Sequence, residues 1–505
     1  MATYLGIDVG TSSVKAVLLD EDQALIAEGS APVEVLRPRP MWSEQDPEEW
    51  WLAAQKAVTR VRNLAPEAFL QVEGIGLSGQ QHSATLLDGQ GRVLRPAILW
   101  NDGRCGRECA ELLERVPDFM VRSSNTTMPG FTAPKLLWVA RHEPEIFEKT
   151  AKVLLPKDYL RYRLSGDYVS DMSDSAGTLW LDVGKRCWDD VLLDACAMKR
   201  PQMPDLVEGA EVSAHLSEEV AKAWGLGGRK IPIAGGGGDN ASSAVGIGAV
   251  GPGDGFLSLG TSGVLFVSTD RLVSLPERTL HGFCHALPQR WHGMVVALSA
   301  ASALSWLASL TGHQHDVAGL IEKAKQFAAD PGRREAAPVF LPYLTGERTP
   351  HNDPNATAGF SGLRAEHDAG ALAYAVLEGV AFALADGLDV LKAADAAPRS
   401  CMLVGGGSRS AYWNGLLADV LGLSLDLPEG AEIGAAFGAA RLGMVAAEAG
   451  TIETVCRKPA IRARFTPDPE KAPILTERRA RYLGMYPGAI KETAREPEPV
   501  LGPMV

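Results

Sequence analysis

The segment at residues 4–20 reads YLGIDVGTSSVKAVLLD, and the segment at residues 255–268 reads GFLSLGTSGVLFVS. Each contains two apolar stretches typical of strands, joined by a short turn of glycine and hydroxyl residues. Gly10-Thr11-Ser12 in the first aligns with Gly260-Thr261-Ser262 in the second. Two similar hairpins, one opening each half of the chain, predict an internal duplication.

Both turns have the composition of an anion site, because glycine and hydroxyl residues in a turn present N–H and O–H donors. Facing each other, they could hold a polyphosphate from both sides. The phosphate-binding candidates are therefore Gly10, Thr11, Ser12, Lys15, Gly260, Thr261 and Ser262. The copies differ at one position, where Asp8 corresponds to Ser258, so only the first hairpin offers a carboxylate for a metal ion.

Four glycines, an acid and an amide follow each other at residues 235–240, directly after the apolar run IPIA at residues 231–234. Glycine lets the backbone turn sharply and approach a ligand closely. A carboxylate at a helix start is stabilised by backbone N–H groups and the helix dipole. The pattern therefore indicates that Asp239 is a general base beside a phosphate. The alternative is a tight strand-to-helix turn with Asp239 as its N-cap.

These motifs together resemble those of the FGGY family of carbohydrate kinases. Residues 130–142 are similar to the first signature of that family. Residues 358–378 are similar to its second signature, apart from Ala371, where a polar residue is usual. The resemblance runs from about Thr3 to about Gly450. It implies an α/β protein with two actin-like (ribonuclease H-like) domains, a central cleft and a hinge.

The break at Gly251-Pro252-Gly253-Asp254 supports a division of the chain near residue 250. We expect an N-terminal domain at residues 1–250 with the sugar site and the base, and a C-terminal domain at residues 251–486 that binds the nucleotide. Residues 487–505 contain several helix breakers and are expected to add little to the core.

The resemblance implies ATP as the phosphoryl donor and Mg²⁺ as the cation, with Asp239 and Asp8 as catalytic groups and metal ligands. It also implies an adenosine-binding loop after the strand at residues 400–404. The candidates there are Gly405, Gly406, Gly407, Ser408 and Asn414. Glycine would let a flat base or ribose lie against the backbone; the alternative is a simple strand-to-helix turn.

Within the family, residues 42–47, 79–82 and 99–104 are similar to those of kinases that phosphorylate D-xylulose. The implied sugar ligands are Trp42, Gln81, His82, Asn101, Asp102, Arg104, Asp239 and Asn240. Polar side chains at the carboxyl end of a strand are where open α/β sheets bind ligands. The alternatives are a solvated loop, an internal Asp102–Arg104 ion pair and a core position for Trp42. Gln81 stands where these kinases more often have methionine.

The predicted activity is therefore transfer of a phosphoryl group from ATP to D-xylulose, giving the 5-phosphate. A kinase for another ketose or polyol, such as ribulose or xylitol, would share the phosphate residues and differ near Gln81, His82 and Asn101. A non-catalytic actin-like ATP-binding protein would keep the hairpins without needing Asp239 or the sugar loops.

Composition limits the partners. The 505 residues carry a formal net charge of -13 and no Lys/Arg run, which argues against nucleic acid as a partner. Seven scattered cysteines and the lack of a signal-peptide pattern predict a cytoplasmic protein with reduced thiols. Residues 294–310 are uncharged and mostly apolar, and we expect a buried helix there, with no membrane span. A homodimer is left open.

Overall fold

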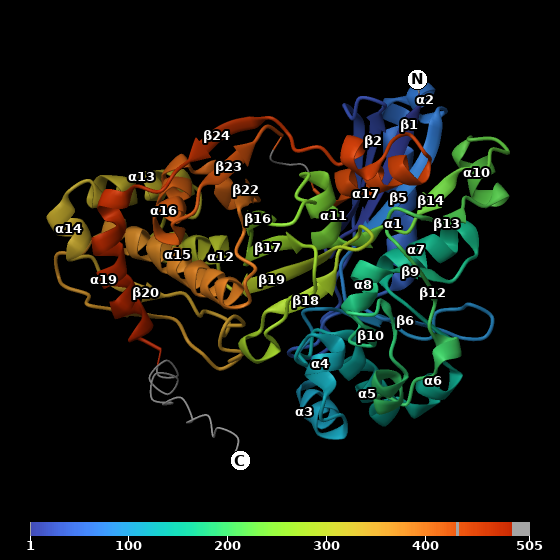
Figure 1. Cartoon of the computed structure of the whole chain (residues 1–505), viewed down its shortest axis with the longest axis horizontal. Helices are drawn as coiled ribbons and strands as arrows, with labels where there is room; N and C mark the ends of the chain where they lie inside the picture. The colour runs from blue at the N-terminus through green and yellow to red at the C-terminus, as the bar shows by residue number, and fades with distance from the viewer. Residues whose placement is uncertain (1, 431–433, 487–505) are drawn as a thin grey trace, which may run out of the picture.

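A computed structural model describes residues 2–430 and 434–486. The chain forms two lobes, with the first half on the right of Figure 1 and most of the second half on the left. A seven-stranded sheet lies in each lobe. The tail at residues 487–505, on which one prediction was made, lies outside the described residues.

The N-terminal sheet has the order β13-β14-β5-β1-β2-β3, with β15 also paired to β5. The C-terminal sheet has the order β18-β19-β17-β16-β22-β23-β24. In the N-terminal sheet the strands are β1 (Thr3–Val9), β2 (Ser13–Asp20), β3 (Leu25–Pro32), β5 (Val72–Gly79), β13 (Val212–His215), β14 (Pro232–Ala234) and β15 (Gly237–Gly238). In the C-terminal sheet they are β16 (Asp254–Leu259), β17 (Gly263–Thr269), β18 (His281–Cys284), β19 (Trp291–Ala297), β22 (Ser400–Val404), β23 (Leu425–Pro428) and β24 (Ile461–Phe465).

The two sheets repeat one pairing pattern. β1 pairs antiparallel with β2 and parallel with β5. β16 pairs antiparallel with β17 and parallel with β22 in the same way. In both sheets the next neighbour, β14 or β23, continues the parallel order, and an antiparallel strand follows it. The internal duplication predicted from the hairpins is therefore present in the fold.

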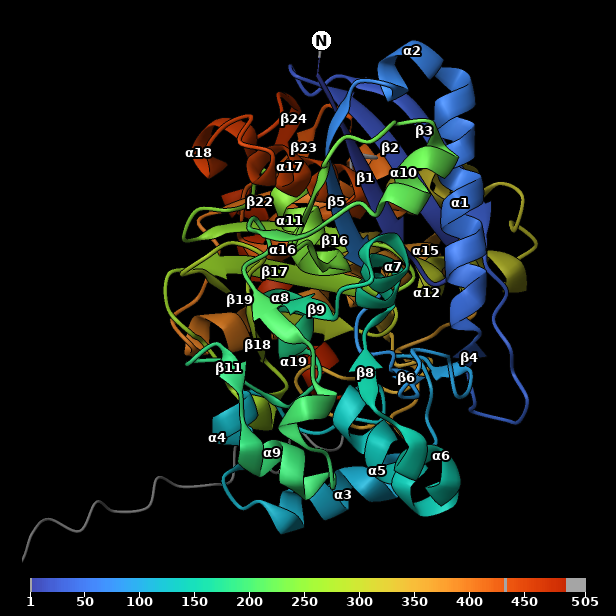
Figure 2. The same ribbon diagram turned by 90° about the vertical axis from the view of Figure 1, so that its right-hand side faces the viewer.

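The rest of the N-terminal half consists of helices and short strands. Its helices are α1 (Pro47–Leu64), α2 (Pro66–Phe69), α3 (Gly106–Arg115), α4 (Phe119–Ser123), α5 (Thr132–His142), α6 (Pro144–Lys149), α7 (Pro156–Ser165), α8 (Met172–Ala176), α9 (Asp190–Ala195), α10 (Glu218–Trp224) and α11 (Asp239–Gly246). Its short strands are β4 (Glu44–Gln45), β6 (Thr85–Leu87), β7 (Ala97–Ile98), β8 (Lys152–Leu154), β9 (Val169–Asp171), β10 (Leu181–Asp182), β11 (Cys187–Trp188) and β12 (Asp205–Val207). Helices α3 to α6 gather below the sheet, as Figure 2 shows.

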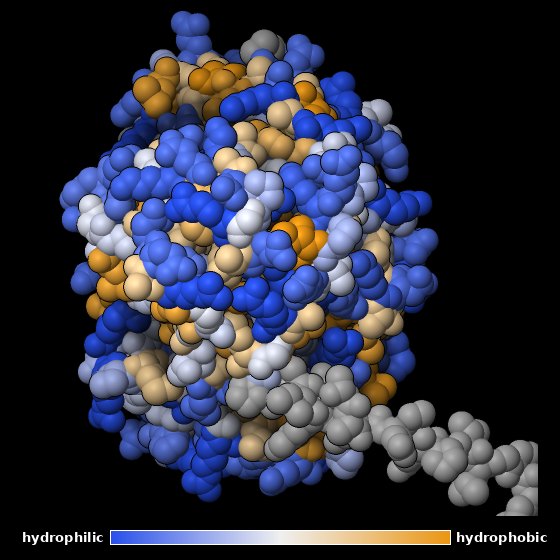
Figure 3. Space-filling view, turned by 90° about the vertical axis from the view of Figure 1, so that its left-hand side faces the viewer, coloured by the Kyte–Doolittle hydropathy of each residue, from blue (hydrophilic) through white to orange (hydrophobic). Residues whose placement is uncertain are grey.

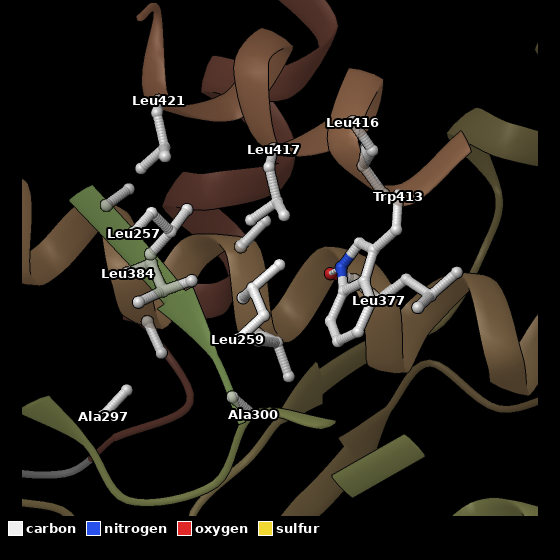
Figure 4. Packing of buried hydrophobic residues seen from close by; sticks show 14 of the residues in the cluster. Leu257, Leu259, Ala297, Ala300, Leu377, Leu384, Trp413, Leu416, Leu417 and Leu421 are labelled. Carbon is white, nitrogen blue, oxygen red and sulfur yellow. Dashed lines mark hydrogen bonds between the residues drawn. The ribbon is translucent and has the colours of Figure 1, made fainter. Parts of the chain in front are cut away.

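The C-terminal half contains helices α12 (Ala301–Leu310), α13 (Val317–Ala328), α14 (Pro331–Glu335), α15 (Ala369–Ala393), α16 (Ala411–Leu421), α17 (Ala435–Ala446), α18 (Ile452–Val455) and α19 (Ala472–Leu483), with strands β20 (Val339–Leu341) and β21 (Gly359–Ser361). Its core lies between β16 and helices α15 and α16 (Figure 4). There Leu257 and Leu259 of β16 pack beside Leu417. Trp413 fills the same layer, and its indole N–H donates to the carbonyl oxygen of Leu377 (3.1 Å).

The two halves of the chain pack against each other in several places, of which two position the site. Helix α17 belongs to the second half of the sequence, yet it packs on α11 and on β1 and β5 of the N-terminal sheet. The helices approach so closely that a side chain on Gly438 would meet the backbone oxygen of Ser242. At the other end, Phe283 and Met294 of β18 and β19 share an apolar cluster with Phe131 of the N-terminal half.

The apolar stretch at residues 294–310 is not one buried helix, as the sequence suggested. It is the end of strand β19 followed by helix α12, and the non-helical residues 298–300 separate them. The β-branched pair Val295-Val296 favours a strand and overrides the continuous apolar pattern. Among the described residues, one helix, α15, is long and apolar enough to cross a membrane. Its most apolar 18-residue segment is 94% buried inside the protein.

The outer face of the C-terminal lobe is mostly hydrophilic, with apolar residues scattered over it (Figure 3). All seven cysteines are free, and Cys187 alone among them is exposed.

Candidate active site

A cavity of about 250 Å³ lies where the two lobes meet. Its wall from the N-terminal half is formed by Gln81, His82, Trp100, Met128, Gly130, Phe131, Asp239 and Asn240. Its wall from the C-terminal half is formed by Ser262, Val264, Met294, Val296 and Arg348. Four predicted sugar ligands therefore share one cavity with the second phosphate hairpin.

Asp239 is the first residue of α11, and the glycine-rich loop before it carries β15. One carboxylate oxygen accepts hydrogen bonds from the backbone N–H (2.8 Å) and the side-chain amide (3.0 Å) of Asn240. Burial raises the pKa of Asp239 to about 7, and the nearby negative charge of Asp8 adds to the rise. A carboxylate with a pKa near neutrality can accept a proton and release it, as a general base must.

Asp8 lies opposite Lys15 across the first hairpin. Burial raises the pKa of Asp8, while the Ser78 hydroxyl and Lys15 act in the other direction. One of its buried carboxylate oxygens has no hydrogen-bond partner among the described residues. Lys15 itself pairs with Glu28 (3.5 Å).

Both hairpin turns are closed by a backbone hydrogen bond from their glycine, although the first turn is one residue longer than the second. The N–H of Gly10 donates to the carbonyl oxygen of Ser13, and that of Gly260 to the oxygen of Ser262, both at 3.1 Å. Within the described chain, the backbone N–H groups of Thr11 and Ser12, and those of Thr261 and Ser262, have no acceptor. These groups are the donors that an anion would need.

The Thr11 hydroxyl already has two partners. It donates to the Gln80 side chain (3.0 Å) and accepts from the indole N–H of Trp100 (2.9 Å). Gln80 and Thr11 are further tied to the buried Gln45. At this turn, anion binding would therefore rely on backbone N–H groups and Ser12, while the threonine side chain holds the turn in place.

His82 has a left-handed backbone conformation (φ 72°) that non-glycine residues seldom adopt. Its carbonyl oxygen accepts hydrogen bonds from the Thr132 hydroxyl (2.9 Å) and the Lys135 ammonium (3.0 Å), both at the start of α5. The first signature segment therefore fixes the sugar loop. Gln81 packs beside Gly238, where any larger residue would collide with its amide.

The His82 ring is neutral, because burial and the charge of Lys135 lower its pKa to about 3. Nδ1 lies 2.8 Å from the carbonyl oxygen of Gly177 and must therefore carry the proton. Nε2 is then an acceptor for a substrate hydroxyl.

The remaining predicted sugar ligands lie outside the cavity wall. Asp102 is buried and accepts three hydrogen bonds from Arg104 and one from the backbone N–H of Ser43. Arg104 also pairs with Glu44 (2.8 Å) and stacks over the Trp42 ring (3.6 Å). Asn101 is exposed. Their contacts hold the loop that carries Trp100, and a direct sugar contact by these four residues stays a prediction without a supporting contact.

Sequence reasoning missed the aromatic and charged side chains Trp100, Phe131 and Arg348 of the cavity wall, and also its aliphatic residues Met128, Val264, Met294 and Val296. Trp100 lies inside the motif at residues 99–104, but the sugar ligands expected from that motif are its polar residues Asn101, Asp102 and Arg104. Phe131 lies in the first signature. The only signal for Arg348 was a charged loop, Gly346-Glu347-Arg348, between a short apolar run and Pro350.

A second cavity, of about 690 Å³, lies wholly in the C-terminal lobe. Gly406 and Gly407 line it together with residues of α12, α13 and α16. Gly405 has φ 87°, and a side chain there would strike the backbone of Leu259. A side chain on Gly406 would meet open space, so the backbone there is bare toward the cavity, as an adenosine site requires.

Ser408 and Asn414 are buried beneath this loop. The Ser408 hydroxyl donates to the Gly405 carbonyl oxygen, and the Asn414 amide donates to the Ser408 carbonyl oxygen, both at 2.7 Å. In this structure they shape the loop. Nucleotide contact by either residue stays a prediction.

The acidic groups fit a Mg²⁺ ion that is bound mainly through a nucleotide. The described residues hold no cluster of three or more His, Cys, Asp or Glu side chains. Asp8 and Asp239 are close enough to affect each other's charge, and Asp8 has an unpartnered oxygen. Mg²⁺ typically uses one or two carboxylates, several waters and substrate phosphates, so two acids suffice.

Comparison with known proteins agrees with this geometry. Residues 3–246 match the N-terminal domain, and residues 255–447 the C-terminal domain, of the FGGY family of carbohydrate kinases. The chain is 53% identical over 487 residues to the xylulose kinase of Escherichia coli K12, covering 96% of this chain and 98% of that one.

Solved structures show the same likeness. A crystal structure described as a xyloylose kinase from Brucella ovis has a TM-score of 0.92 and 48% identity, covering 97% of this chain and 100% of that one. A xylulose kinase from Rhodospirillum rubrum has a TM-score of 0.89 and 30% identity, with 98% and 100% coverage. The predicted fold class and enzyme class are confirmed: the chain belongs to the FGGY family of carbohydrate kinases.

Proposed function

We propose that this kinase transfers the γ-phosphoryl group of ATP to D-xylulose, giving D-xylulose 5-phosphate. The observation that carries the proposal is one cavity between the lobes that joins a carboxylate of near-neutral pKa, Asp239, to the sugar loop Gln81-His82. The relatives described as xylulose kinases support D-xylulose as the acceptor.

In the proposed mechanism, Asp239 accepts the proton of the attacking hydroxyl. The unpaired N–H groups of the turns at Thr11-Ser12 and Thr261-Ser262 hold phosphate oxygens from opposite lobes. Catalysis then depends on alignment and on stabilising charge where it develops. A Mg²⁺ ion held near Asp8 and Asp239 would neutralise part of the phosphate charge.

Neutral His82 receives a hydroxyl of the sugar at Nε2, while Gln81 offers both a donor and an acceptor. Replacing His82 with alanine leaves a substrate hydroxyl unpaired, which costs about 1–3 kcal/mol, or about 5- to 150-fold in affinity. A kinase for another ketose or polyol is the remaining alternative. The free cysteines support the further proposal of a reducing, cytoplasmic environment.

The test is a comparison of kcat/KM for D-xylulose, D-ribulose, L-ribulose, L-xylulose and xylitol, measured by coupled ADP production. We expect the highest value for D-xylulose. A higher value for any other acceptor would overturn the proposed sugar and leave the kinase class standing. Excess chelator in the same assay should stop turnover, because the phosphate charge would no longer be neutralised.

A further inference from the structure

The half-buried Arg348 differs from the buried arginines of this protein, Arg161, Arg441 and Arg478. The guanidinium of Arg478 is paired with Glu378 and three carbonyl oxygens, and that of Arg161 with Asp158 and the backbone. Arg441 donates to Gln23 and two carbonyl oxygens. By contrast, the Arg348 guanidinium has no hydrogen bond or ion pair with any residue that the structure describes, although it lines the cavity with Asp239.

The loop that carries Arg348 is firmly held. The Glu347 carboxylate accepts hydrogen bonds from the backbone N–H of Leu298 (2.9 Å) and of Arg348 (2.7 Å). The Thr279 hydroxyl donates to the Arg348 carbonyl oxygen (3.0 Å). The Glu347 carboxylate is thus hydrogen-bonded to backbone N–H groups, and the Arg348 guanidinium lines the cavity. A cation placed this way is costly unless a ligand supplies acceptors.

Arg348 and His82 line the same cavity, and they are close enough for the charge of Arg348 to act on the histidine. The positive charge of Arg348 contributes to lowering the pKa of His82 and of His281. The pKa of Asp239 responds to Asp8, at the phosphate end. For an acceptor whose reacting hydroxyl lies at Asp239, Arg348 and His82 are the charged and polar side chains of this cavity wall that remain for its other oxygens, together with Gln81 and Asn240.

The chemistry of the side chain defines what it can receive. Guanidinium has only donors, arranged in a planar fork that suits two neighbouring acceptor oxygens. The end of a ketose remote from its reacting hydroxyl has a carbonyl oxygen, an obligate acceptor, next to a hydroxyl. In a polyol the carbonyl is replaced by a hydroxyl, which is a less complementary partner.

Resting on the proposed function, we propose that Arg348 binds the C2 carbonyl and C1 hydroxyl oxygens of the acceptor and selects ketoses over polyols. It is then a specificity residue supplied by the C-terminal lobe to a sugar otherwise held by the N-terminal lobe. The acceptor bridges the lobes through this contact.

The test measures dissociation constants of D-xylulose and xylitol without nucleotide, using titration calorimetry, for wild type, Arg348→Met and Arg348→Lys. Arg271→Met is the control, because Arg271 is an exposed arginine of the same lobe whose one side-chain partner within residues 2–430 and 434–486 is Asp395. We expect Arg348→Met to weaken D-xylulose binding by about 10- to 150-fold. Xylitol binding should change less than about threefold, and Arg348→Lys should lie between.

An equal loss for both ligands, or an unchanged preference for D-xylulose over xylitol, would overturn the inference. Wild type that does not distinguish the two ligands would overturn it as well. Thermal unfolding shows whether each variant is folded. If Arg348→Met does not fold, the ratio of the D-xylulose and xylitol dissociation constants is tested with Arg348→Lys. Failure of the proposed function would appear separately, as a lack of D-xylulose phosphorylation by wild type.

Discussion

Asp239 and Asp8 are neighbouring carboxylates for which we propose different roles. Burial raises the pKa of Asp239 to about 7, and the charge of Asp8 is its second cause. Asp239 must be deprotonated to accept a proton, so the active fraction increases as the pH rises through this pKa. We expect kcat/KM for the acceptor to fall on the acid side with a limb at or below about pH 7, because a bound cation lowers the pKa further.

Asp8→Asn provides the matched control for this pH profile. It removes a negative charge near the base and therefore lowers the pKa of Asp239, so the acid limb should move to lower pH even as turnover falls. Asp239→Asn should reduce turnover by about 10²–10⁴-fold with ATP binding retained. Identical acid limbs in wild type and Asp8→Asn would show that Asp8 does not tune the base.

The site residues that sequence predicted are those defined by local patterns. Asp239 follows its glycines, and Gln81 and His82 follow a strand, so chain order alone places them at the cavity. Trp42 and Arg104 were placed in the sugar site by resemblance, yet their contacts are with each other and with Glu44 and Asp102. Arg348 depends on contacts between segments about 70 residues apart, such as the one with Thr279, which no local pattern encodes.

At the level of secondary-structure elements, a buried network of charged side chains contacts the glycine-rich loop that precedes Asp239. Lys157 of α7 pairs with Asp158, with Asp171 (2.8 Å) and with Asp174 (3.3 Å). Asp171 accepts from the Ser173 hydroxyl, which in turn accepts the N–H of Gly238 (3.2 Å). The network therefore connects α7 and α8 to the residue immediately before Asp239.

Asp174 and Asp158 should respond differently to neutralisation. Burial raises the pKa of Asp174 well above its usual value, which favours its neutral form, so we expect an amide to replace it with little change. Asp158 pairs with both Lys157 and Arg161, so Asp158→Asn leaves buried cations undercompensated. We expect Asp174→Asn to change the unfolding free energy by less than about 1 kcal/mol. Asp158→Asn should cost about 3–5 kcal/mol.

Urea unfolding of the two variants checks this prediction, and each serves as the control for the other. Equal destabilisation would mean that Asp174 is charged in the folded protein. Because Asp174→Asn keeps the network neutral at that position, its kcat should also stay near wild type.

Elements with strong local signals were predicted well. Strand β22 and the two hairpins, β1–β2 and β16–β17, lie where the sequence placed them, because their apolar runs end at glycine. The prediction of one buried helix at residues 294–310 was wrong, because a fully buried strand and a buried helix are both continuously apolar. The position of α17 on the opposite lobe could not be foreseen, since it arises from close packing of small residues between halves of the chain.

In the whole molecule, the two substrates have different relations to the lobes. Residues of both halves line the cavity that we propose for the sugar, whereas every residue around the cavity proposed for the adenosine belongs to the C-terminal half. A sugar therefore gains contacts when the lobes approach, and the adenosine part of a nucleotide does not. Binding energy that is released only on closure assembles the site and limits wasteful hydrolysis of ATP.

We therefore expect D-xylulose alone to close the molecule more than a non-hydrolysable ATP analogue alone. Small-angle scattering should show a smaller radius of gyration with saturating sugar and little change with the analogue. Arg348→Met at saturating sugar should close less than wild type, because it lacks the contact from the C-terminal lobe, while Arg271→Met should behave as wild type. Equal contraction with sugar and with the analogue, at saturation shown by calorimetry, would contradict closure driven by the acceptor. It would instead indicate that contacts between the nucleotide phosphates and the two hairpin turns drive the closure.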